Sequence, residues 1–537
     1  MAGSNQDWDI EADVVGVGSG GGAMLACVVA EEAGLSSLLL ERAEVLGGGE
    51  IYSGAQMWIP CNHYARELGI EDSVDDAMQS IRATSLDRHD EEIARAYFDA
   101  APEMLRFLED RAEAKTMLIA RPDYVTDVPG AKVDGRFLEP RPFKGEEELG
   151  DFARKIRVSP YLPKHLPKGT WGGSGMALIG PLAKALRKRD IPIVFDTRVR
   201  ELITEDGAVV GLRAEQGGRQ VRIKANYGVI LNTGGFTWDL EQLKRTTHGP
   251  IPQGFTPPVI EGDGIRMATA LGAATAMMDA HMYLPCLEVP GETHLEGEPL
   301  HRMVMGPTQP GGIFVNRYGK RYCNEAEWTD ILRGSLAYDF VSDGSRRDYL
   351  NVPPIFIFDQ EYRAKYITAT LPQVGKSGMF PDWVKAGDTI AELAEALEIE
   401  PAVLEETVER FNRFALEGKD PDFHRGERQA DRWFGDNTKD TPNASLGPLE
   451  TPPYFAIVLT MGSCGNTGGL VTNTQSQVIN SFGDTIPGLY ACGLDQAALN
   501  MGYGVHWGPV SNALTFGYVA GKDCADRAGK PLAFSAG

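Results

Sequence analysis

The clearest hydrophobic pattern lies at the start of the chain. Residues Ala12 to Val17 form a short apolar run rich in valine, which is typical of a buried parallel strand. Small and apolar residues from Ala23 to Ala33 predict a helix that ends at Gly34, where glycine suits the C-terminal cap. Leu35 to Leu40 predict a second strand. Together these segments predict a βαβ unit.

Regular patterns return in three longer stretches. Residues 64–118 predict amphipathic helices, residues 172–188 predict another helix, and residues 191–232 predict a run of short strands. Asp206-Gly207 and Gly217-Gly218 interrupt that run as hairpin turns. The strands expected there are Ile193–Phe195, Val199–Thr204, Val209–Glu215, Val221–Ile223 and Val229–Asn232.

The last part of the chain repeats the strand-and-helix pattern of the first. Residues 488–493 predict a strand and turn, and Pro509 to Ala525 predict a helix. Residues 240–440 mix helices and strands, with the clearest helix from Pro401 to Leu416. Residues 119–168 lack periodicity, which is typical of a functional loop or lid. These patterns predict an α/β fold: a Rossmann-like domain, split in the sequence, with an α+β insertion.

The size and charge of the chain narrow its class. Its 537 residues exceed the roughly 250–300 residues of a single core, so two domains are expected. The formal net charge of −23 argues against nucleic acid and anionic membrane surfaces as partners, and an anionic substrate would need a locally basic pocket. No window approaches the about 20 consecutive apolar residues of a membrane helix, so no transmembrane segment is expected.

Cysteine usage points to a reducing compartment. The seven cysteines are scattered, odd in number and never spaced as C-x-x-C. This usage is typical of reduced thiols, and the polar, acidic N-terminus does not resemble a signal peptide, so a cytoplasmic location is predicted. No metal site is expected.

A glycine-rich turn joins the first predicted strand to the first predicted helix. Gly18, Gly20 and Ala23 have the spacing of a dinucleotide-binding motif, which also includes Gly22. Gly18 permits a tight turn, and Gly20 lets a pyrophosphate approach the backbone at the helix N-terminus. Glu41 ends the next strand, where it can accept hydrogen bonds from ribose hydroxyls and disfavour a 2′-phosphate. This motif alone fits either NAD or FAD.

A second glycine run favours FAD over NAD. Gly48 and Gly49 follow the second predicted strand closely and lead into Ser53, Gly54 and Ala55. Backbone without side chains would let this segment approach the pyrophosphate, the ribityl chain or the flavin ring.

Several further segments carry a family resemblance. They are Trp58-Ile59-Pro60, residues 229–236, residues 317–321 with Asn324-Glu325, residues 423–427, residues 468–470 and residues 515–518. Together with the glycine motifs they span nearly the whole chain. The sequence resembles the fumarate reductase/succinate dehydrogenase flavoprotein superfamily, and within it most closely the 3-ketosteroid dehydrogenases.

The resemblance implies an FAD domain at residues 8–270 and 451–537, with a catalytic domain at 271–450 that caps the flavin. It implies noncovalent FAD, since no histidine for a covalent link lies between residues 47 and 55. It also implies that the helix after Pro509 directs its N-terminus at the flavin. The further cofactor-binding positions that it implies are Val199, Thr233, Gly234, Gly493, Asp495, Ser511, Asn512 and Leu514.

The family chemistry implies a catalytic tyrosine. A group polarises the ketone, a tyrosine takes the adjacent proton, and the neighbouring carbon gives hydride to flavin N5. Tyr503 matches that tyrosine, whose ordinary pKa of about 10 means that it needs a partner or a nearby positive charge. The stretch after it departs from the family pattern, so the N–H that binds the ketone passes to Gly508, is replaced by His506, or is lost.

Other family positions match less directly. Tyr124 lies in the loop that carries another active-site tyrosine in the family. Thr329 occupies the column where steroid dehydrogenases have a tyrosine and fumarate reductases an arginine. Trp328 beside it would narrow the pocket for a smaller ring, and Tyr338 is a substitute acid or base.

These features predict an FAD-dependent dehydrogenase that introduces a C=C bond next to a ring ketone, either a 3-ketosteroid or a smaller cyclohexanone-type substrate. Quinone, oxygen or another electron acceptor would reoxidise the flavin. The alternative is a fumarate- or urocanate-type enoate reductase, for which Arg302, Arg317, Arg321 and Arg333 would be candidates to lie over the flavin. A third interpretation is an FAD-binding carrier or sensor without turnover.

Overall fold

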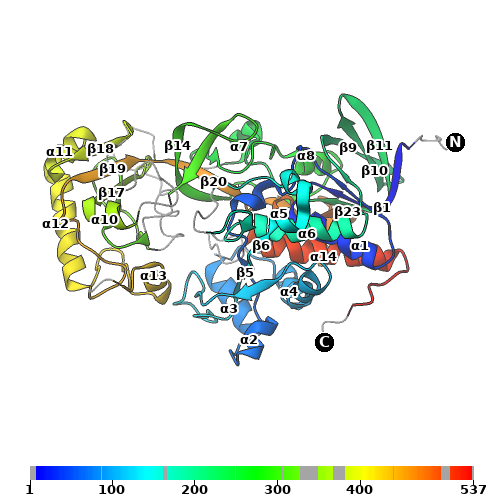
Figure 1. The fold of residues 1–537 in the computed structure, drawn as a ribbon, viewed down its shortest axis with the longest axis horizontal. Helices are drawn as coiled ribbons and strands as arrows, with labels where there is room; N and C mark the ends of the chain where they lie inside the picture. The colour runs from blue at the N-terminus through cyan, green and yellow to red at the C-terminus, as the bar shows by residue number, and fades with distance from the viewer. Residues whose placement is uncertain are drawn as a thin grey trace.

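The computed structural model describes most of the chain. It covers residues 8–85, 87–160, 166–247, 249–304, 308–326, 349–366, 381–438, 441–497 and 508–534. The molecule is elongated, with the first strand and the C-terminal helix at one end and helices α11 (Ile390–Ala396) and α12 (Pro401–Glu417) at the other (Figure 1). Within these ranges, no helix has both the length and the apolar character needed to cross a membrane.

The predicted βαβ unit is confirmed. Strand β1 (Ile10–Val17), helix α1 (Gly21–Glu32) and strand β2 (Ser37–Leu40) follow one another, and β1 and β2 are parallel. Helix α1 begins two residues before the prediction, at Gly21, although glycine is a poor helix former. The reason is tertiary, because only residues without side chains fit where α1 packs against the C-terminal helix.

An eight-stranded sheet lies in the part of the molecule that contains β1 and α14, and it includes strands from both the first and the last part of the chain. Its main order is β22–β23–β11–β1–β2–β8, with β10 and β9 extending from β11. Strand β23 (Thr485–Ala491) runs parallel to the end of β11 (Arg219–Leu231), and helix α14 (Pro509–Arg527) packs along α1 (Figure 1). The split α/β domain is therefore confirmed. The remaining strands are β8 (Ile193–Val194), β9 (Thr197–Glu205), β10 (Ala208–Gln216) and β22 (Gln477–Ile479).

The antiparallel arm of this sheet corrects one prediction. Asp206-Gly207 and Gly217-Gly218 form the two predicted turns, all four residues with positive φ. The strands expected at 221–223 and 229–232 are one strand, β11, which pairs with β1 along both halves. A register shift opposite Ala12 and Val14 interrupts the alternation of the sequence without ending the strand.

The region predicted as helical at 64–118 contains three helices and a strand. The helices are α2 (His63–Glu67), α3 (Val74–Thr84) and α4 (Glu91–Asp110). Residues 116–118 form strand β4 (Thr116–Leu118) instead of helix. Glu109 explains this turn of the chain, because its carboxylate accepts hydrogen bonds from the backbone N–H (2.9 Å) and the hydroxyl (2.6 Å) of Thr116.

The segment without periodicity, residues 119–168, contains short elements. Strand β5 (Phe137–Pro140) lies between β3 (Met57–Trp58) and β4. Strands of two to four residues are too short to give a detectable period, which is why the pattern missed them. Nearby elements are β6 (Phe143–Lys144), α5 (Gly145–Leu149), the 3₁₀ turn η2 (Gly150–Lys155), β7 (Thr170–Trp171) and α6 (Met176–Lys188).

The inserted part adds two four-stranded sheets. Their orders are β12–β20–β14–β15 and β16–β17–β19–β18. Two of these strands, β19 (Tyr454–Val458) and β20 (Thr460–Asn466), come from beyond residue 450. The domain boundaries at residues 270 and 450 stay predictions. The other strands are β12 (Gln253–Gly254), β14 (His281–Thr293), β15 (Pro299–Met303), β16 (Gly312–Val315), β17 (Ile355–Asp359) and β18 (Val384–Gly387).

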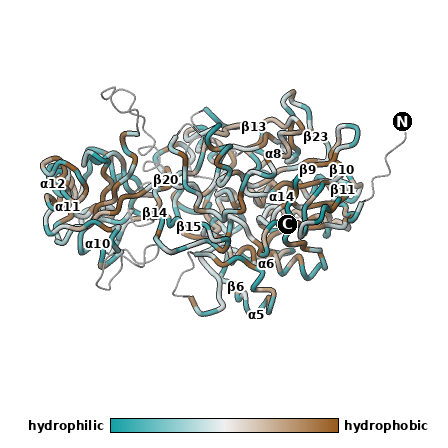
Figure 2. Tube along the Cα trace, turned by 90° about the horizontal axis from the view of Figure 1, so that it is seen from above, coloured by the Kyte–Doolittle hydropathy of each residue, from teal (hydrophilic) through white to brown (hydrophobic). Residues whose placement is uncertain are grey.

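Apolar side chains form several cores. One lies between the main sheet and helices α1, α4, α6 and α14, a second lies on the opposite face of the sheet, and others lie around β17 and α12. Figure 2 shows apolar segments at both ends of the molecule. The predicted helix at 401–416 is confirmed as α12. The smaller elements are α7 (Leu240–Thr246), α8 (Asp263–Ala270), α10 (Gln360–Lys365), α13 (Gln429–Phe434), β13 (Thr275–Ala276) and β21 (Gly469–Leu470).

Candidate active site

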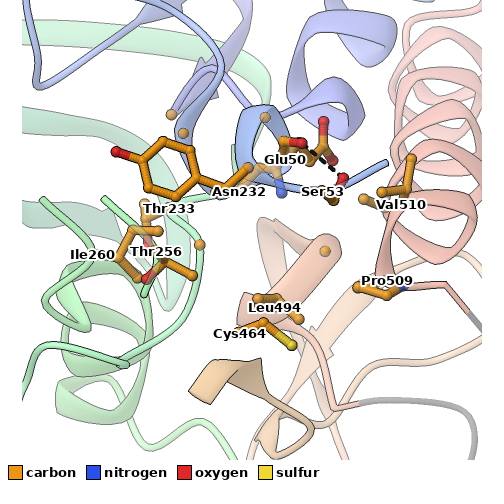
Figure 3. A pocket seen from close by; sticks show the side chains of 18 of the residues that line it. Glu50, Ser53, Asn232, Thr233, Thr256, Ile260, Cys464, Leu494, Pro509 and Val510 are labelled. Carbon is orange, nitrogen blue, oxygen red and sulfur yellow. Dashed lines mark hydrogen bonds between the residues drawn. The ribbon is translucent and has the colours of Figure 1, made fainter. Parts of the chain in front are cut away.

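A large cavity lies between the main sheet and the inserted part. One wall comes from the glycine turn after β1, the 3₁₀ helix η1 (Gly48–Tyr52), the loop after β11 and the start of α14. The other wall comes from β14, β20 and α13. Figure 3 shows Glu50 and Ser53 facing the same space as Pro509 and Val510, so the fold brings distant parts of the chain to one site.

The glycine turn leaves no room for side chains. Gly18 has φ +93°, and a Cβ there would lie 2.3 Å from the carbonyl oxygen of Asn232. A Cβ on Gly20 would lie 2.4 Å from the side-chain oxygen of the same asparagine. Both positions therefore require glycine, as the motif predicted.

Asn232 is a residue of this site that the sequence analysis did not single out. Its Oδ1 accepts a hydrogen bond from the N–H of Ala23 (3.1 Å), and its Nδ2 donates to the carbonyl of Cys492 (3.3 Å). One side chain at the end of β11 thus connects the start of α1 with the C-terminal strand. Its position after a buried strand and directly before Thr233-Gly234 was the sequence feature that could have identified it as a site residue.

Glu41 lies at the end of β2 and faces the cavity. One carboxylate oxygen accepts hydrogen bonds from the backbone N–H (3.0 Å) and hydroxyl (2.5 Å) of Ser19, and the other accepts from the N–H of Ala43 (2.7 Å). Burial raises the pKa of this carboxyl above its usual value. A carboxylate has about four acceptor positions, so it retains capacity for hydroxyl donors.

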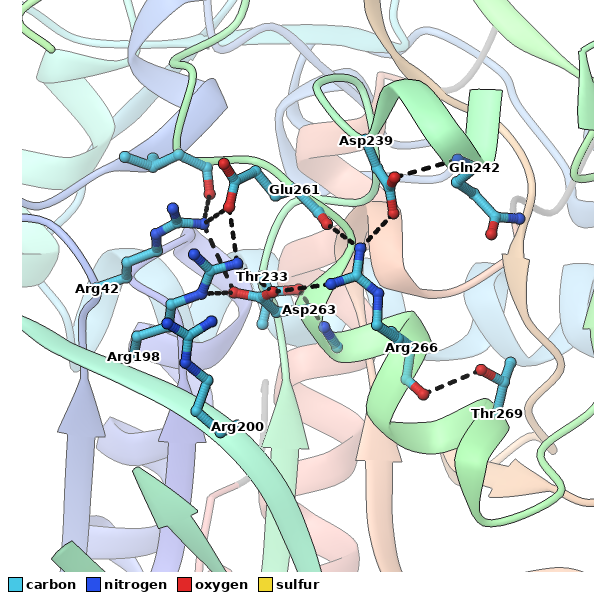
Figure 4. A network of polar contacts seen from close by, with 12 residues as sticks. Arg42, Arg198, Arg200, Thr233, Asp239, Gln242, Glu261, Asp263, Arg266 and Thr269 are labelled. Carbon is cyan, nitrogen blue, oxygen red and sulfur yellow. Dashed lines mark hydrogen bonds and ion pairs between the residues drawn. The ribbon is translucent and has the colours of Figure 1, made fainter. Parts of the chain in front are cut away.

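Two arginines near Glu41 are already neutralised. Arg42 pairs with Glu261 at 2.7 Å, and Arg198 pairs with both Asp263 and Glu261 at 2.7 Å (Figure 4). Both arginines line the cavity. Their carboxylate partners leave little net positive charge for a 2′-phosphate. This agrees with the expectation that Glu41 favours an unphosphorylated ribose.

Glu50 is the second residue that the sequence analysis missed. It lies in η1, and its Oε2 accepts a hydrogen bond from the N–H of Gly21 (2.7 Å), at the start of α1. Burial raises the pKa of its carboxyl to about 7. An acidic group therefore occupies a helix N-terminus of the kind that binds anions.

The predicted cofactor residues form two layers. Those that line the cavity are Gly18, Gly20, Glu41, Gly48, Gly49, Ser53, Gly54, Ala55, Val199, Thr233, Gly234 and Gly493. Those outside this lining are Gly22, Ala23, Asp495, Ser511, Asn512 and Leu514. Asp495, for example, accepts hydrogen bonds from the hydroxyl of Thr233 (2.9 Å) and the N–H of Gly235 (3.2 Å), and so shapes the wall.

The donor set fits FAD. The N-terminus of α1 beside Gly18 and Gly20 suits a diphosphate, and Glu41 suits a ribose. The side-chain-free wall formed by Gly48 and Gly49 continues the cradle towards the start of α14. A Cβ on Gly18 or Gly20 would collide with its surroundings, so this shape depends on glycine.

Tyr124 lies on the aromatic part of the cavity wall. Its ring stacks on Phe434 with centroids 6.4 Å apart and contacts Phe137 edge-on at 5.8 Å. The guanidinium of Arg121 lies 4.4 Å from the centre of the tyrosine ring. Trp433 also lines this wall. Part of the stretch 119–168, which was predicted to be a functional loop or lid, therefore contributes an aromatic surface to the cavity.

Gly508 lies at the N-cap of α14 and also lines the cavity. A Cβ there would lie 2.6 Å from the carbonyl oxygen of Gln56, so the position requires glycine. The other predicted catalytic residues, Tyr338, Tyr503 and His506, lie outside the described residues, as do Trp328 and Thr329.

The arginines that an enoate reductase would use are engaged elsewhere. Arg302 and Arg321 each pair with a carboxylate, at 2.5 and 2.8 Å, and Arg317 donates to backbone carbonyls. None of these three lines the cavity, and Arg333 lies outside the described residues.

The comparisons with known proteins agree with this geometry. Residues 13–507 match the family model described as FAD binding domain. A 4-oxocyclohexanecarboxylate 2-dehydrogenase from Sinomonas cyclohexanicum is 35% identical over 96% of this chain and 93% of its own. A 3-oxosteroid 1-dehydrogenase from Mycolicibacterium smegmatis is 33% identical over 96% and 97%.

A solved structure supports the same relationship. The crystal structure of 3-ketosteroid delta1-dehydrogenase from Sterolibacterium denitrificans, in complex with 1,4-androstadiene-3,17-dione, has a TM-score of 0.87 and 28% sequence identity, and the match covers 96% of this chain and 100% of that one. The cradle and the family model both indicate FAD as the cofactor, and these relatives are dehydrogenases. The chain belongs to the FAD binding domain family, as a flavin-dependent oxidoreductase of the 3-ketosteroid dehydrogenase-like group.

Proposed function

We propose that this protein desaturates a ring ketone at the bond α,β to the carbonyl. The observation that carries the proposal is a single cavity with an FAD cradle on one wall and the aromatic wall of Tyr124 on the other. The α-carbon loses a proton to a protein base, and the β-carbon loses a hydride. Bound FAD supplies the acceptor for that hydride and its two electrons.

Specific residues supply the base and the polarising group. Tyr124 and Tyr503 are the tyrosines proposed to handle the proton, with Tyr338 as a substitute. The guanidinium of Arg121, 4.4 Å from the Tyr124 ring centre, places a cation beside that tyrosine. The N–H of Gly508, the N-cap residue of α14, is proposed to bind the ketone oxygen, or His506 takes that role.

The relatives' names set the range of substrates to test. They include 4-oxocyclohexanecarboxylate and 3-oxosteroids, both of which are ring ketones. Anaerobic mixing of the FAD-loaded protein with each compound, and with cyclohexanone, measures loss of the visible flavin absorbance. We expect at least one ring ketone to bleach the flavin. If none does, while reduced protein is reoxidised by fumarate or urocanate, the enoate reductase alternative is correct.

Tyrosine variants test the proposed bases. We expect Tyr124→Phe or Tyr503→Phe to slow bleaching by about 10²–10⁴-fold, the usual contribution of a positioned acid or base. Tyr318→Phe is the control, because Tyr318 is 47% exposed and does not line the cavity. The flavin content of each variant shows whether the cradle is intact. Full-rate bleaching by both active-site variants would remove tyrosine from the proposed mechanism.

We also propose a cytoplasmic location. All seven cysteines are free in the structure, which suits a reducing compartment. The acceptor that reoxidises the flavin, whether quinone, oxygen or another compound, stays a prediction. Aerobic and quinone-dependent reoxidation of the bleached protein would distinguish these acceptors.

A further inference from the structure

Arg121 is a buried cation in the aromatic wall of the cavity. Its residue is 5% exposed, and the side chain lines the same cavity as the FAD cradle. Its guanidinium carbon lies 4.4 Å from the ring centre of Tyr124, 4.5 Å from Phe137, 5.3 Å from Phe434 and 5.6 Å from Trp433. These rings stabilise the charge partly, but they do not replace the hydrogen bonds that water would make.

The guanidinium lacks an anionic partner among the described residues. Its Nη1 donates to the side-chain oxygen of Gln56, whereas its buried Nε has no hydrogen-bond partner. Gln56 in turn contacts Glu139 at 3.5 Å, so a neutral amide stands between the arginine and that carboxylate. A buried charge is costly unless it is paired, so an anion bound beside this guanidinium would be stabilised.

The other two arginines of the cavity, in contrast, form ion pairs with carboxylates. Within the described part of the chain, Arg42, Arg121 and Arg198 are the basic residues that line the cavity. Arg42 and Arg198 have carboxylate partners at 2.7 Å. Arg121 alone among the three is left to face the cavity with its charge uncompensated, on the aromatic wall rather than at the Glu41 end.

We propose that Arg121 binds a carboxylate on the substrate ring, so that the substrate is a ring ketone with an anionic substituent. A guanidinium fits a planar carboxylate with two parallel hydrogen bonds. One unpaired guanidinium matches a single negative charge, and the surrounding rings suit the apolar ring that carries it. The inference rests on the proposed function, because it specifies the substrate of that same site.

The overall charge of the protein strengthens the argument. With a formal net charge of −23, the molecule repels anions at long range. Binding of an anionic substrate therefore requires a local, desolvated cation, where a charge-assisted hydrogen bond is strong. Arg121 has this environment.

The first test compares matched substrates. We expect FAD-loaded wild type to use a 4-carboxylated cyclohexanone with a kcat/KM about 100-fold above that of its neutral 4-carboxamide, the selectivity of a site with a buried charged donor. In Arg121→Gln this ratio should fall to within about threefold of one, and Arg121→Lys should restore part of it. Equal losses on both compounds would overturn the proposal, since they would mean that Arg121 acts only on Tyr124 or on the fold.

The second test does not depend on turnover. Calorimetric titration of the FAD-loaded protein with cyclohexanecarboxylate, which has no ketone, should show binding in wild type and at least about tenfold weaker binding in Arg121→Gln. Arg413→Gln, which removes a positive charge on α12 far from the cavity, should bind like wild type. If no ketone bleaches the flavin but this carboxylate binds through Arg121, the proposed reaction fails and the anion site stands. Binding that is absent or unchanged in Arg121→Gln would overturn the anion site.

Discussion

At the scale of single residues, Glu50 is a carboxyl near the cradle with an unusual pKa. Burial raises the pKa of its carboxyl to about 7, and its oxygen already accepts a hydrogen bond from the N–H of Gly21. Because the folded-state pKa lies above the ordinary 4.5, the folded apoprotein holds an extra proton between those values. Stability of the apoprotein should therefore fall as the pH rises through that window.

The same carboxyl predicts a pH dependence of cofactor binding. Above pH 7 or so the charged form opposes a diphosphate at the shared helix N-terminus, so FAD affinity should fall as the pH rises from about 6 to about 8. Fluorescence titration of the apoprotein measures this, and Glu50→Gln should flatten the dependence. The exposed neighbour Glu44, changed to Gln, should leave it in place. A full pH dependence in Glu50→Gln would exclude this carboxyl as the cause.

Residues of the site differ in how far the sequence could predict them. Gly18, Gly20 and Glu41 belong to one local motif, so spacing alone placed them. Arg121 and Asn232 meet the cavity through strand pairing and packing between segments far apart in the chain. No local pattern distinguishes such residues from ordinary surface arginines or loop asparagines, because their role depends on what the fold brings beside them.

At the scale of elements, the segment 423–427, which carries part of the family resemblance, has a structural explanation. Arg425 is fully buried and donates to Glu325 at 3.0 Å. Glu325 also pairs with Arg321 at 2.8 Å, and Arg321 pairs with Asp420 at 2.9 Å. This ion network joins the loop after β16 to the segment that follows α12, so the resemblance carried by both segments reflects the fold of the inserted part.

Breaking this network should destabilise the protein strongly. We expect Glu325→Ala to lower the free energy of unfolding by about 3–5 kcal/mol, because it leaves buried guanidinium groups without their carboxylate. Urea unfolding followed by tryptophan fluorescence measures the change. Glu406→Ala removes an exposed partner of Lys320 and should cause no resolvable change. Similar midpoints for both variants would contradict a structural role for the buried network.

Element prediction succeeded where patterns were long. The β1–α1–β2 unit and α14 are largely buried, and their runs of small and apolar residues were visible in the sequence, as was the buried face of α12. Strands β3, β4 and β5 have only two to four residues each, so their pairing, rather than any repeat, defines them. Strand β11 was divided wrongly because the residues at its register shift, Asn226 and Tyr227, interrupt the apolar pattern as a loop would.

At the scale of the whole molecule, the two ends of the chain depend on one close contact. A Cβ on Gly22 of α1 would lie 2.5 Å from the carbonyl of Ala513 in α14 and 2.7 Å from the sulfur of Cys492. Gly22→Val should therefore push α14 away from α1, lower the melting temperature and reduce the FAD content, with Gly22→Ala intermediate. Differential scanning fluorimetry and flavin quantification measure both effects. Asp526→Val, at an exposed position in the last turn of α14, introduces the same β-branched side chain outside this contact, and an equal effect there would contradict the packing argument.

The pairing of β23 with β11 has a consequence for synthesis in the cell. The ribosome makes β11 some 250 residues before β23, so at about 5–20 residues per second the edge of β11 at Val229–Leu231 waits roughly 13–50 s for its partner strand. During that time an apolar strand edge is available to chaperones or to other nascent chains. Because α14 supplies part of the cavity wall, the complete cradle forms only after this last helix has left the ribosome, which makes loading with FAD a late event in the maturation of the protein.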